Sequence, residues 1–315
     1  MGQEPEQVVL EFDVPVPGPD ASVAELVRHD LAASTLRLLR HEHTIRLGKD
    51  PEGEAPPGWD HEEVHQARVA TRRWRSTLRT FAGMLDPDWA GRLSGELSWL
   101  AGLLGAARDA DVLLAGFERD LARLPDEDAE AGRRLLKRLV AARAADHGRL
   151  LAAMEEPRHA ALVDDLVAAV RAPAWTPQAG QPATEAVPPL VARHWRRLRR
   201  AVDGAGDHAS DEALHRIRIR AKRCRYAAEA AVPVIGEPAR AFAKAVERLQ
   251  EVLGEQHDAV VAEGWLHEAA ASARRQEAFV AGQLAAAERA RAEAAREHWR
   301  QAWKAASRKR LRAWL

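Results

Sequence analysis

Apolar residues recur at helical spacing along most of the chain. Val64, Ala67, Trp74 and Leu78, for example, fall on one stripe if successive residues turn by about 100°. Such stripes predict helices over residues 22–47, 60–85, 87–124, 127–155 and 157–171, and again over 189–202, 210–232, 238–271 and 274–315. Alanine, leucine, arginine and glutamate dominate the composition, and all four favour helices. We therefore expect an all-α fold.

Prolines interrupt this pattern near the middle of the chain. Residues 171–189 hold five prolines and Gly180. Proline lacks a backbone donor and clashes with the preceding turn, so this stretch cannot form one continuous helix. We predict a linker at residues 172–188, which separates a first helical bundle at 21–171 from a second at 189–315. Residues 1–20 are expected to form an N-terminal tail.

The two halves of the chain repeat two motifs in the same order. Residues 64–75 read VHQARVATRRWR, and residues 214–225 read LHRIRIRAKRCR. Downstream, LAGLLGAARDADV at 100–112 corresponds to LQEVLGEQHDAVV at 249–261, which matches Gly105 with Gly254 and Asp109 with Asp258. Two matched motifs in one order indicate the internal duplication of a helical unit.

Basic and acidic residues balance over the whole chain but not along it. The chain has 47 of each, which gives a formal net charge of zero. Residues 64–81 nevertheless contain five arginines and no acid, and residues 213–228 contain six arginines or lysines and no acid. Charge of one sign that is concentrated locally creates a strong field even in a neutral protein. Both segments are therefore candidates for binding an anion.

The basic residues of each segment line one face of its predicted helix. The first stripe comprises His65, Arg68, Arg72, Arg75 and Arg79, spaced three or four residues apart. The second stripe comprises His215, Arg218, Lys222 and Arg225. Like charges at this spacing repel by roughly 0.2–0.5 kcal/mol per pair, and a bound polyanion would offset that repulsion. Arginine suits phosphate because its planar guanidinium donates two parallel hydrogen bonds. The alternative is a basic face that is solvated or neutralised by acids of neighbouring helices.

The segments VHQARVATRRWRSTLRTF and LHRIRIRAKRCRYAAE, with the downstream LGAARD and LGEQHD, resemble the paired signature of the CHAD family, named for its conserved histidines and α-helical content. The resemblance implies two pseudo-symmetric four-helix bundles and a basic groove that binds inorganic polyphosphate. The predicted polyphosphate-binding residues are His65, Arg68, Arg72, Arg73, Arg75, Arg79, His215, Arg218, Lys222, Arg223 and Arg225. Cys224 stands where a Leu-like residue is expected, a change that affects packing rather than charge.

Two further basic clusters either extend this site or are simply exposed. They contain Arg37, Arg40, His41 and Arg46 in the first half and Arg193, Arg196 and Arg197 in the second, where Arg199 and Arg200 continue the basic run. The basic, tryptophan-containing run at residues 299–315 could touch nucleic acid or a membrane. We expect instead a final bundle helix with buried tryptophans and solvated cations.

Two short motifs offer an enzymatic alternative. Residues 61–65 read HEEVH, the HExxH pattern of zinc proteases, but His61 has no counterpart in the second half and His65 belongs to the first stripe. His257-Asp258 resembles the metal dyad of HD-type phosphohydrolases, yet its counterpart is Arg108-Asp109. We expect both aspartates to hold a cation of their stripe, and the protein to bind polyphosphate without catalysis, metal or cofactor. A metal-dependent phosphohydrolase and a nucleic-acid-binding protein are the alternatives.

The sequence also favours a location. Cys224 is the single cysteine, which excludes an intramolecular disulfide and fits a reducing compartment. No stretch of about 18 apolar residues occurs, and residues 1–19 lack the pattern of a signal peptide. We therefore expect a cytoplasmic protein, associated with polyphosphate granules and not with a membrane. Members of the family often follow a CYTH triphosphatase domain, for which residues 1–20 are too short.

Overall fold

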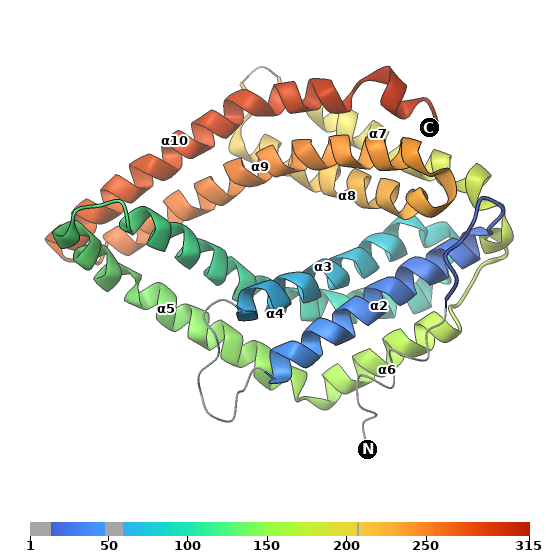
Figure 1. Ribbon diagram of the computed structural model, residues 1–315, viewed down its shortest axis with the longest axis horizontal. Coiled ribbons are helices and arrows are strands. Elements are labelled where there is room, and N and C mark those ends of the chain that lie inside the picture. Colours follow the sequence, from blue (N-terminus) through green and yellow to red (C-terminus); the bar gives the residue numbers. More distant parts are fainter. Residues whose placement is uncertain (1–13, 48–58, 207) are drawn as a thin grey trace. The chain divides into compact units, whose positions relative to one another are not determined.

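The computed structural model describes residues 14–47, 59–206 and 208–315 (Figure 1). The α-helices in these ranges are α2 (Val23–Leu47), α3 (Trp59–Thr80), α4 (Pro87–Leu121), α5 (Asp126–Met154), α6 (Pro157–Arg171), α7 (Ala183–Asp203), α8 (Asp211–Ile235), α9 (Glu237–Ala270) and α10 (Arg275–Ala306). Short 3-10 helices occupy Ala82–Met84, Pro177–Gly180 and Lys309–Arg312. The β-structure in the same ranges consists of isolated bridges, Ser22 with Pro182 and Leu85 with Trp175. The predicted all-α fold is confirmed.

The chain forms two compact units that interleave in sequence. Of the described residues, the first unit contains those up to 109, 144–190 and 230–236, and the second contains those in 110–143, 191–229 and 237–315. The chain passes between them within α4, α5, α7 and α8. These units differ from the two sequence halves, because each takes residues from both. The bundle boundaries at 21–171 and 189–315, and the pseudo-twofold relation between them, stay predictions.

In the first unit, α2 packs along α3 (Figure 1). Trp74 is completely buried and donates from its indole Nε1 to the Thr35 hydroxyl over 3.0 Å. Asp30 of α2 is also buried, and accepts hydrogen bonds from the Thr77 hydroxyl and from Arg73 Nε. Buried polar groups are costly unless they are paired. These contacts therefore fix the register of α3 on α2.

In the second unit, α9 packs along α10, and an apolar cluster around Phe117, Leu266 and Leu284 forms part of the core. The apolar face of α8 is buried, including Cys224, and burial raises the pKa of the Cys224 thiol. The predicted packing role of this cysteine is thus confirmed.

The C-terminal tryptophans pack within the second unit, but the prediction holds only in part: α10 ends before Trp314, and Trp303 and Trp314 are half-buried. Trp299 is buried, and Trp303 stacks on Trp195 of α7 with ring centroids 4.9 Å apart. Trp314 meets Phe242 edge to face at 6.1 Å. Aromatic pairs of this geometry add to the stabilisation from buried area. None of the described helices is long and apolar enough to cross a membrane.

One error in the predicted helices concerns the proline-rich segment. The predicted linker ran to residue 188, but α7 begins at Ala183 and contains Pro188 and Pro189. Val187, Val191 and Trp195 are buried at a spacing of four residues. The carbonyls that lose a helical donor belong to Thr184 and Glu185, which are exposed, so water can replace it. Burial of the apolar face outweighs the cost of the two prolines. In addition, the helix predicted at 60–85 ends at Thr80 and is followed by a 3-10 turn. The helix predicted at 274–315 ends at Ala306 and is followed by the 3-10 helix Lys309–Arg312.

Candidate polyanion-binding site

The first stripe flanks the buried face of α3 rather than opposing it. Val64, Ala67 and Leu78 are buried, whereas His65, Arg68, Arg72 and Arg75 are half-buried and Arg79 is exposed. Long basic side chains at such positions pack their methylene groups on the core and direct the charge outward. Five basic groups therefore follow one edge of the core of the first unit.

Arg68 is held by the LGAARD motif of α4. Its Nη1 donates to a carboxylate oxygen of Asp109 over 2.6 Å and to the Gly105 carbonyl over 3.3 Å. A Cβ added at Gly105 would lie 3.9 Å from the guanidinium carbon of Arg68. That distance is an ordinary van der Waals contact, so the guanidinium packs on α4 at this glycine, and the aspartate orients it.

The second unit repeats this arrangement between α8 and α9. Arg218 Nη2 lies 3.6 Å from a carboxylate oxygen of Asp258, and a Cβ added at Gly254 would lie 3.9 Å from Arg218 Nε. The prediction that Asp109 and Asp258 each hold a cation of their stripe is confirmed. The aspartate of the proposed HD-type dyad is therefore engaged with an arginine.

The histidine of each stripe has a depressed pKa. Burial lowers the pKa of His65 first, and the charges of Arg108 and then of Arg72 and Arg68 lower it further against an opposing effect of Glu62. Burial, followed by Arg218 and Lys222, lowers the pKa of His215. Burial is thus the larger cause at both histidines, and the neighbouring cations lower the two pKa values further.

His215 also has a neighbour that His65 lacks. Its Nδ1 lies 3.2 Å from Nδ1 of His257, with ring centroids 4.5 Å apart. Burial lowers the pKa of His257 too, followed by the charges of Arg218 and His215. In the first half, Arg108 occupies the place of His257. The two copies of the site therefore differ in fixed charge at this point.

Arg73 and Arg223 share a motif position but differ in their surroundings. Arg73 Nε lies 3.2 Å from the buried carboxylate of Asp30, so its guanidinium takes part in the α2–α3 core contact. Arg223 instead lines a pocket of the second unit. The two positions do not contribute in the same way to an anion site.

Arg75 and Arg225 form a second pair of unequal copies. Arg225 is bound by Glu247 at 2.6 Å and by Glu229 at 3.2 Å, and lies over the ring of Tyr226 at 4.8 Å. Arg75 has no ion pair with a carboxylate in the described parts of the chain. One turn later, Arg79 occupies the position that matches Glu229. Part of its side chain is exposed, and the partial burial of the rest lowers its pKa, as does the charge of Arg75. The end of the first stripe at Arg75 and Arg79 is therefore more cationic than the matching end of the second stripe, at Arg225 and Glu229.

The predicted extension residues divide into two groups. His41 Nδ1 lies 2.6 Å from Glu63, and Arg46 donates to the Met154 carbonyl and contacts buried His159, so both serve contacts within the first unit. The remaining members are exposed on α2 or α7, and they are Arg37, Arg40, Arg193, Arg196 and Arg197. Of these, Arg197 lines the same pocket as Arg223.

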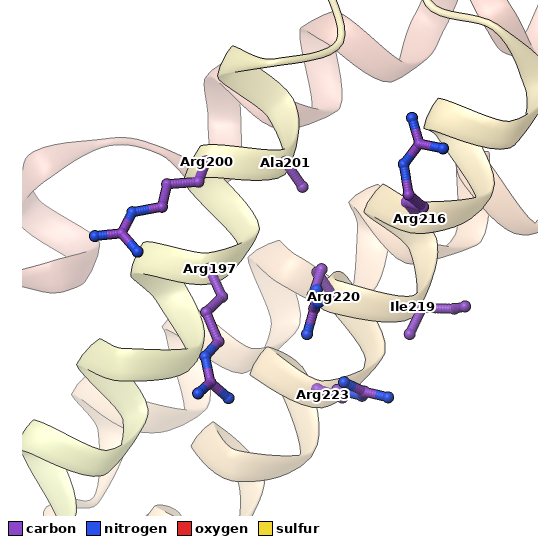
Figure 2. Close-up of a pocket in the computed structure, with 7 residues that line it drawn as sticks. All are labelled: Arg197, Arg200, Ala201, Arg216, Ile219, Arg220 and Arg223. Carbon is purple, nitrogen blue, oxygen red and sulfur yellow. The ribbon is translucent and has the colours of Figure 1, made fainter.

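This arginine pocket lies between α7 and α8 in the second unit (Figure 2). Its volume is about 770 Å³, and it is lined by Arg197, Arg200, Ala201, Arg216, Ile219, Arg220 and Arg223. The predicted binding and extension residues included Arg223 and Arg197, whose basic run also holds Arg200, but not Arg216 or Arg220. The signal was present in the sequence, since 216, 220 and 223 share one helix face and 197 and 200 share another.

The metal motifs do not gather further ligands within the described residues. No group of three or more His, Cys, Asp or Glu side chains there is placed to hold a metal ion. The side chain of His61, the first residue of HEEVH, lies outside the described part, and Glu63 of that motif pairs with His41.

The fold and the site together define a class: an all-α protein with two copies of a cationic, histidine-headed helix. Comparison with known proteins narrows this class to one family. Residues 30–267 match the CHAD domain, and the chain belongs to the CHAD family.

Sequence relatives and solved structures agree with this assignment. The chain is 36% identical over 253 residues to the uncharacterized proteins Rv2226 and MT2285 from two strains of Mycobacterium tuberculosis, a match covering 75% of this chain and 46% of each relative. It thus spans about half the length of these relatives.

Two solved structures share the fold over nearly the whole chain. The CHAD domain from the plant Ricinus communis is 28% identical, with a TM-score of 0.71 over 93% of this chain and 95% of the plant chain. PptA from Streptomyces chartreusis is 26% identical, with a TM-score of 0.70 over 90% of this chain and 100% of that protein.

Proposed function

We propose that this protein binds inorganic polyphosphate through the first and second stripes. Its membership of the CHAD family supports a role related to polyphosphate. One observation carries the proposal: in both copies, an acid-free row of cations flanks the core and its leading arginine is oriented by an aspartate of the next helix. Association with polyphosphate granules is part of the proposal.

The chemistry of the stripes fits a linear polyanion. Guanidinium groups three or four residues apart on a helix are roughly 5–6 Å from one another at the Cβ atoms. A flexible chain with one charge per phosphate can contact several of them in sequence. Arg68 and Arg218 are already oriented, so less side-chain freedom is lost on binding.

The proposed role is binding without chemistry. A metal-dependent phosphohydrolase would use His257, Asp258 and nearby acids, and it would release phosphate in a metal-dependent manner. A nucleic-acid-binding protein would be displaced from long polyphosphate by DNA at equal phosphate concentration and fixed salt. Each alternative thus has a measurement that separates it from the proposal.

The test is a titration with long-chain polyphosphate over a series of salt concentrations. The logarithm of affinity should fall linearly with the logarithm of salt concentration. In the Arg72→Ala/Lys222→Ala variant the slope should become shallower by about 1.5, if each lost phosphate contact contributes roughly 0.7–0.9. The matched control is Arg92→Ala/Arg275→Ala, which removes two exposed cations outside the stripes. Equal slopes for wild type and the stripe variant would reject the proposal.

A further inference from the structure

The arginine pocket concentrates positive charge that the second stripe does not use. Five of its seven lining residues are arginines, and no acidic side chain lines it among the described residues. Arg197 of α7 and Arg220 of α8 lie between the two helices in Figure 2. Arginine stays charged at every physiological pH, so these groups repel one another, and a bound anion would offset that repulsion.

The pocket lies on a different face of α8 from the second stripe. Ile217, Ala221 and Cys224 form the buried face of this helix. The second stripe is centred about 100° to one side of that face, and the positions 216, 220 and 223 are centred about 100° to the other side. An anion bound along the second stripe therefore leaves the pocket charges in place.

The pocket is not part of the duplicated pattern. The first-half positions that match Arg216 and Arg220 hold Gln66 and Ala70. The position that matches Arg223 holds Arg73, which is paired with Asp30. The charges at Arg216 and Arg220 therefore have no counterpart in the first half. A role shared by the two stripes does not account for them.

We propose that the arginine pocket is a separate binding site for a compact polyphosphorylated anion, of the class of short inorganic oligophosphates. Its volume lies within the range of about 300–1,000 Å³ that is usual for small-ligand sites. Arg197 and Arg220, which lie between α7 and α8, can offer paired donors to phosphate oxygens, and the other three arginines line the rest of the pocket. The uncharged lining consists of Ala201 and Ile219, with no aromatic ring on which a nucleobase could stack. These features favour an inorganic oligophosphate over a nucleotide.

The anion has two potential sources: a free short oligophosphate, or a segment of the long chain bound elsewhere on the protein. The pocket proposal stands without the proposed function, because it concerns other residues. The experiment uses the full chain and calorimetric titration with tripolyphosphate. The pocket variant is Arg216→Gln/Arg220→Gln, and the matched control is Arg199→Gln, an exposed arginine of α7 that does not line the pocket.

Wild type, Arg199→Gln and the stripe variant Arg72→Ala/Lys222→Ala should bind one tripolyphosphate with similar affinity. The pocket variant should bind it about 10- to 100-fold more weakly, because two charged donors are lost. Its melting temperature without ligand should not fall, because the substitutions remove like charges. Unchanged binding in the pocket variant, or an equal loss in Arg199→Gln, would overturn the proposal.

Adding long polyphosphate distinguishes the two sources of the pocket anion. It also distinguishes failure of the pocket proposal from failure of the proposed function. If tripolyphosphate stays bound when long polyphosphate is added, the ligand is a free short anion. If the long chain displaces it from the stripe variant, a segment of that chain enters the pocket. Failure of the proposed function would appear as unchanged long-chain binding in the stripe variant, which leaves the tripolyphosphate result intact.

Discussion

Arg75 and Arg225 occupy the same position of the duplicated motif, yet their alanine variants should fail in different assays. Arg225 lies against two carboxylates and an aromatic ring, whereas Arg75 has no ion pair with a carboxylate in the described ranges and neighbours Arg79. We therefore expect Arg75→Ala to weaken polyphosphate binding at nearly constant stability. We expect Arg225→Ala to lower stability with the smaller loss of binding.

The magnitudes follow from these surroundings. The Arg225 side chain is 12% exposed, and its partners Glu247 and Glu229 are 39% and 24% exposed, so solvent partly screens both pairs. Loss of these pairs and of the contact with Tyr226 should cost about 1–2 kcal/mol. That corresponds to a fall in melting temperature of about 3–8 °C for a unit of this size. Arg75→Ala removes a cation from a repulsive pair, so its effect on stability should stay within about 0.5 kcal/mol.

The loss of polyphosphate affinity should be larger for Arg75→Ala than for Arg225→Ala. A hydrogen bond to a charged group is worth about 1.5–3 kcal/mol, so Arg75→Ala should weaken long-chain polyphosphate binding by at least about tenfold. The salt slope should become shallower by roughly 0.7–0.9. Arg225 must first leave its carboxylates to contact phosphate, so its loss should cost less affinity.

The assays are thermal unfolding without ligand and polyphosphate titration at several salt concentrations, with both variants measured side by side. Lysine substitutions at the same two positions keep the charge and show how much depends on the guanidinium fork. If both alanine variants lose stability and affinity to the same extent, the two copies are equivalent and the reasoning from their unequal carboxylates is wrong.

Two further predictions concern the histidines and Asp30. Because burial and neighbouring cations depress the pKa values of His65 and His215, a bound polyanion should raise them, so binding takes up protons and affinity rises as pH falls below about 6.5. The His65→Gln/His215→Gln variant should lose this pH dependence; identical profiles from pH 8 to 5.5 would make the histidines structural. Without ligand, stability should change with pH in the opposite sense. The depressed pKa values of His65 and His215 contribute stability above about pH 6.5, and this stability is lost as pH falls through the folded-state pKa values. Unfolding measurements over the same pH range would show the loss. Asp30→Asn should destabilise the protein by about 1–3 kcal/mol, because it breaks a buried contact to Arg73 and Thr77. The exposed Asp109→Asn control should cost less than about 1 kcal/mol, and equal costs would contradict this.

Periodicity and duplication were sufficient to predict the helices and the cationic faces. The α6 bounds agree with those predicted from the sequence, because Pro157 begins the helix and an apolar stripe continues to its end. The predicted start of α7 was wrong because proline disfavours the interior of a helix, and the sequence does not show how deeply this helix buries its apolar face. Val187 and Val191 are buried on a face that the prolines do not occupy, and only tertiary packing shows this.

The site was predictable along each helix but not between helices. Arg73 belongs to the repeated motif, and its pairing with Asp30 depends on contact between residues 43 positions apart. The arginine pocket likewise requires that Arg197 of α7 meet Arg220 of α8. The Arg68–Asp109 and Arg218–Asp258 pairs were predicted nevertheless. In both halves the aspartate motif follows the basic motif, which indicated the same contact in each.

The aspartates that hold Arg68 and Arg218 also act as built-in competitors for those arginines. Their side chains are 67% and 56% exposed, so an incoming anion can replace them without opening the core. Each carboxylate is tethered next to its guanidinium, and tethering corresponds to an effective concentration in the millimolar range or above. Chloride or a single phosphate at lower concentration displaces it poorly. A chain of phosphates is itself tethered once its first unit binds, so it competes on equal terms. We therefore expect the pairs to act as a threshold that selects for ligand length.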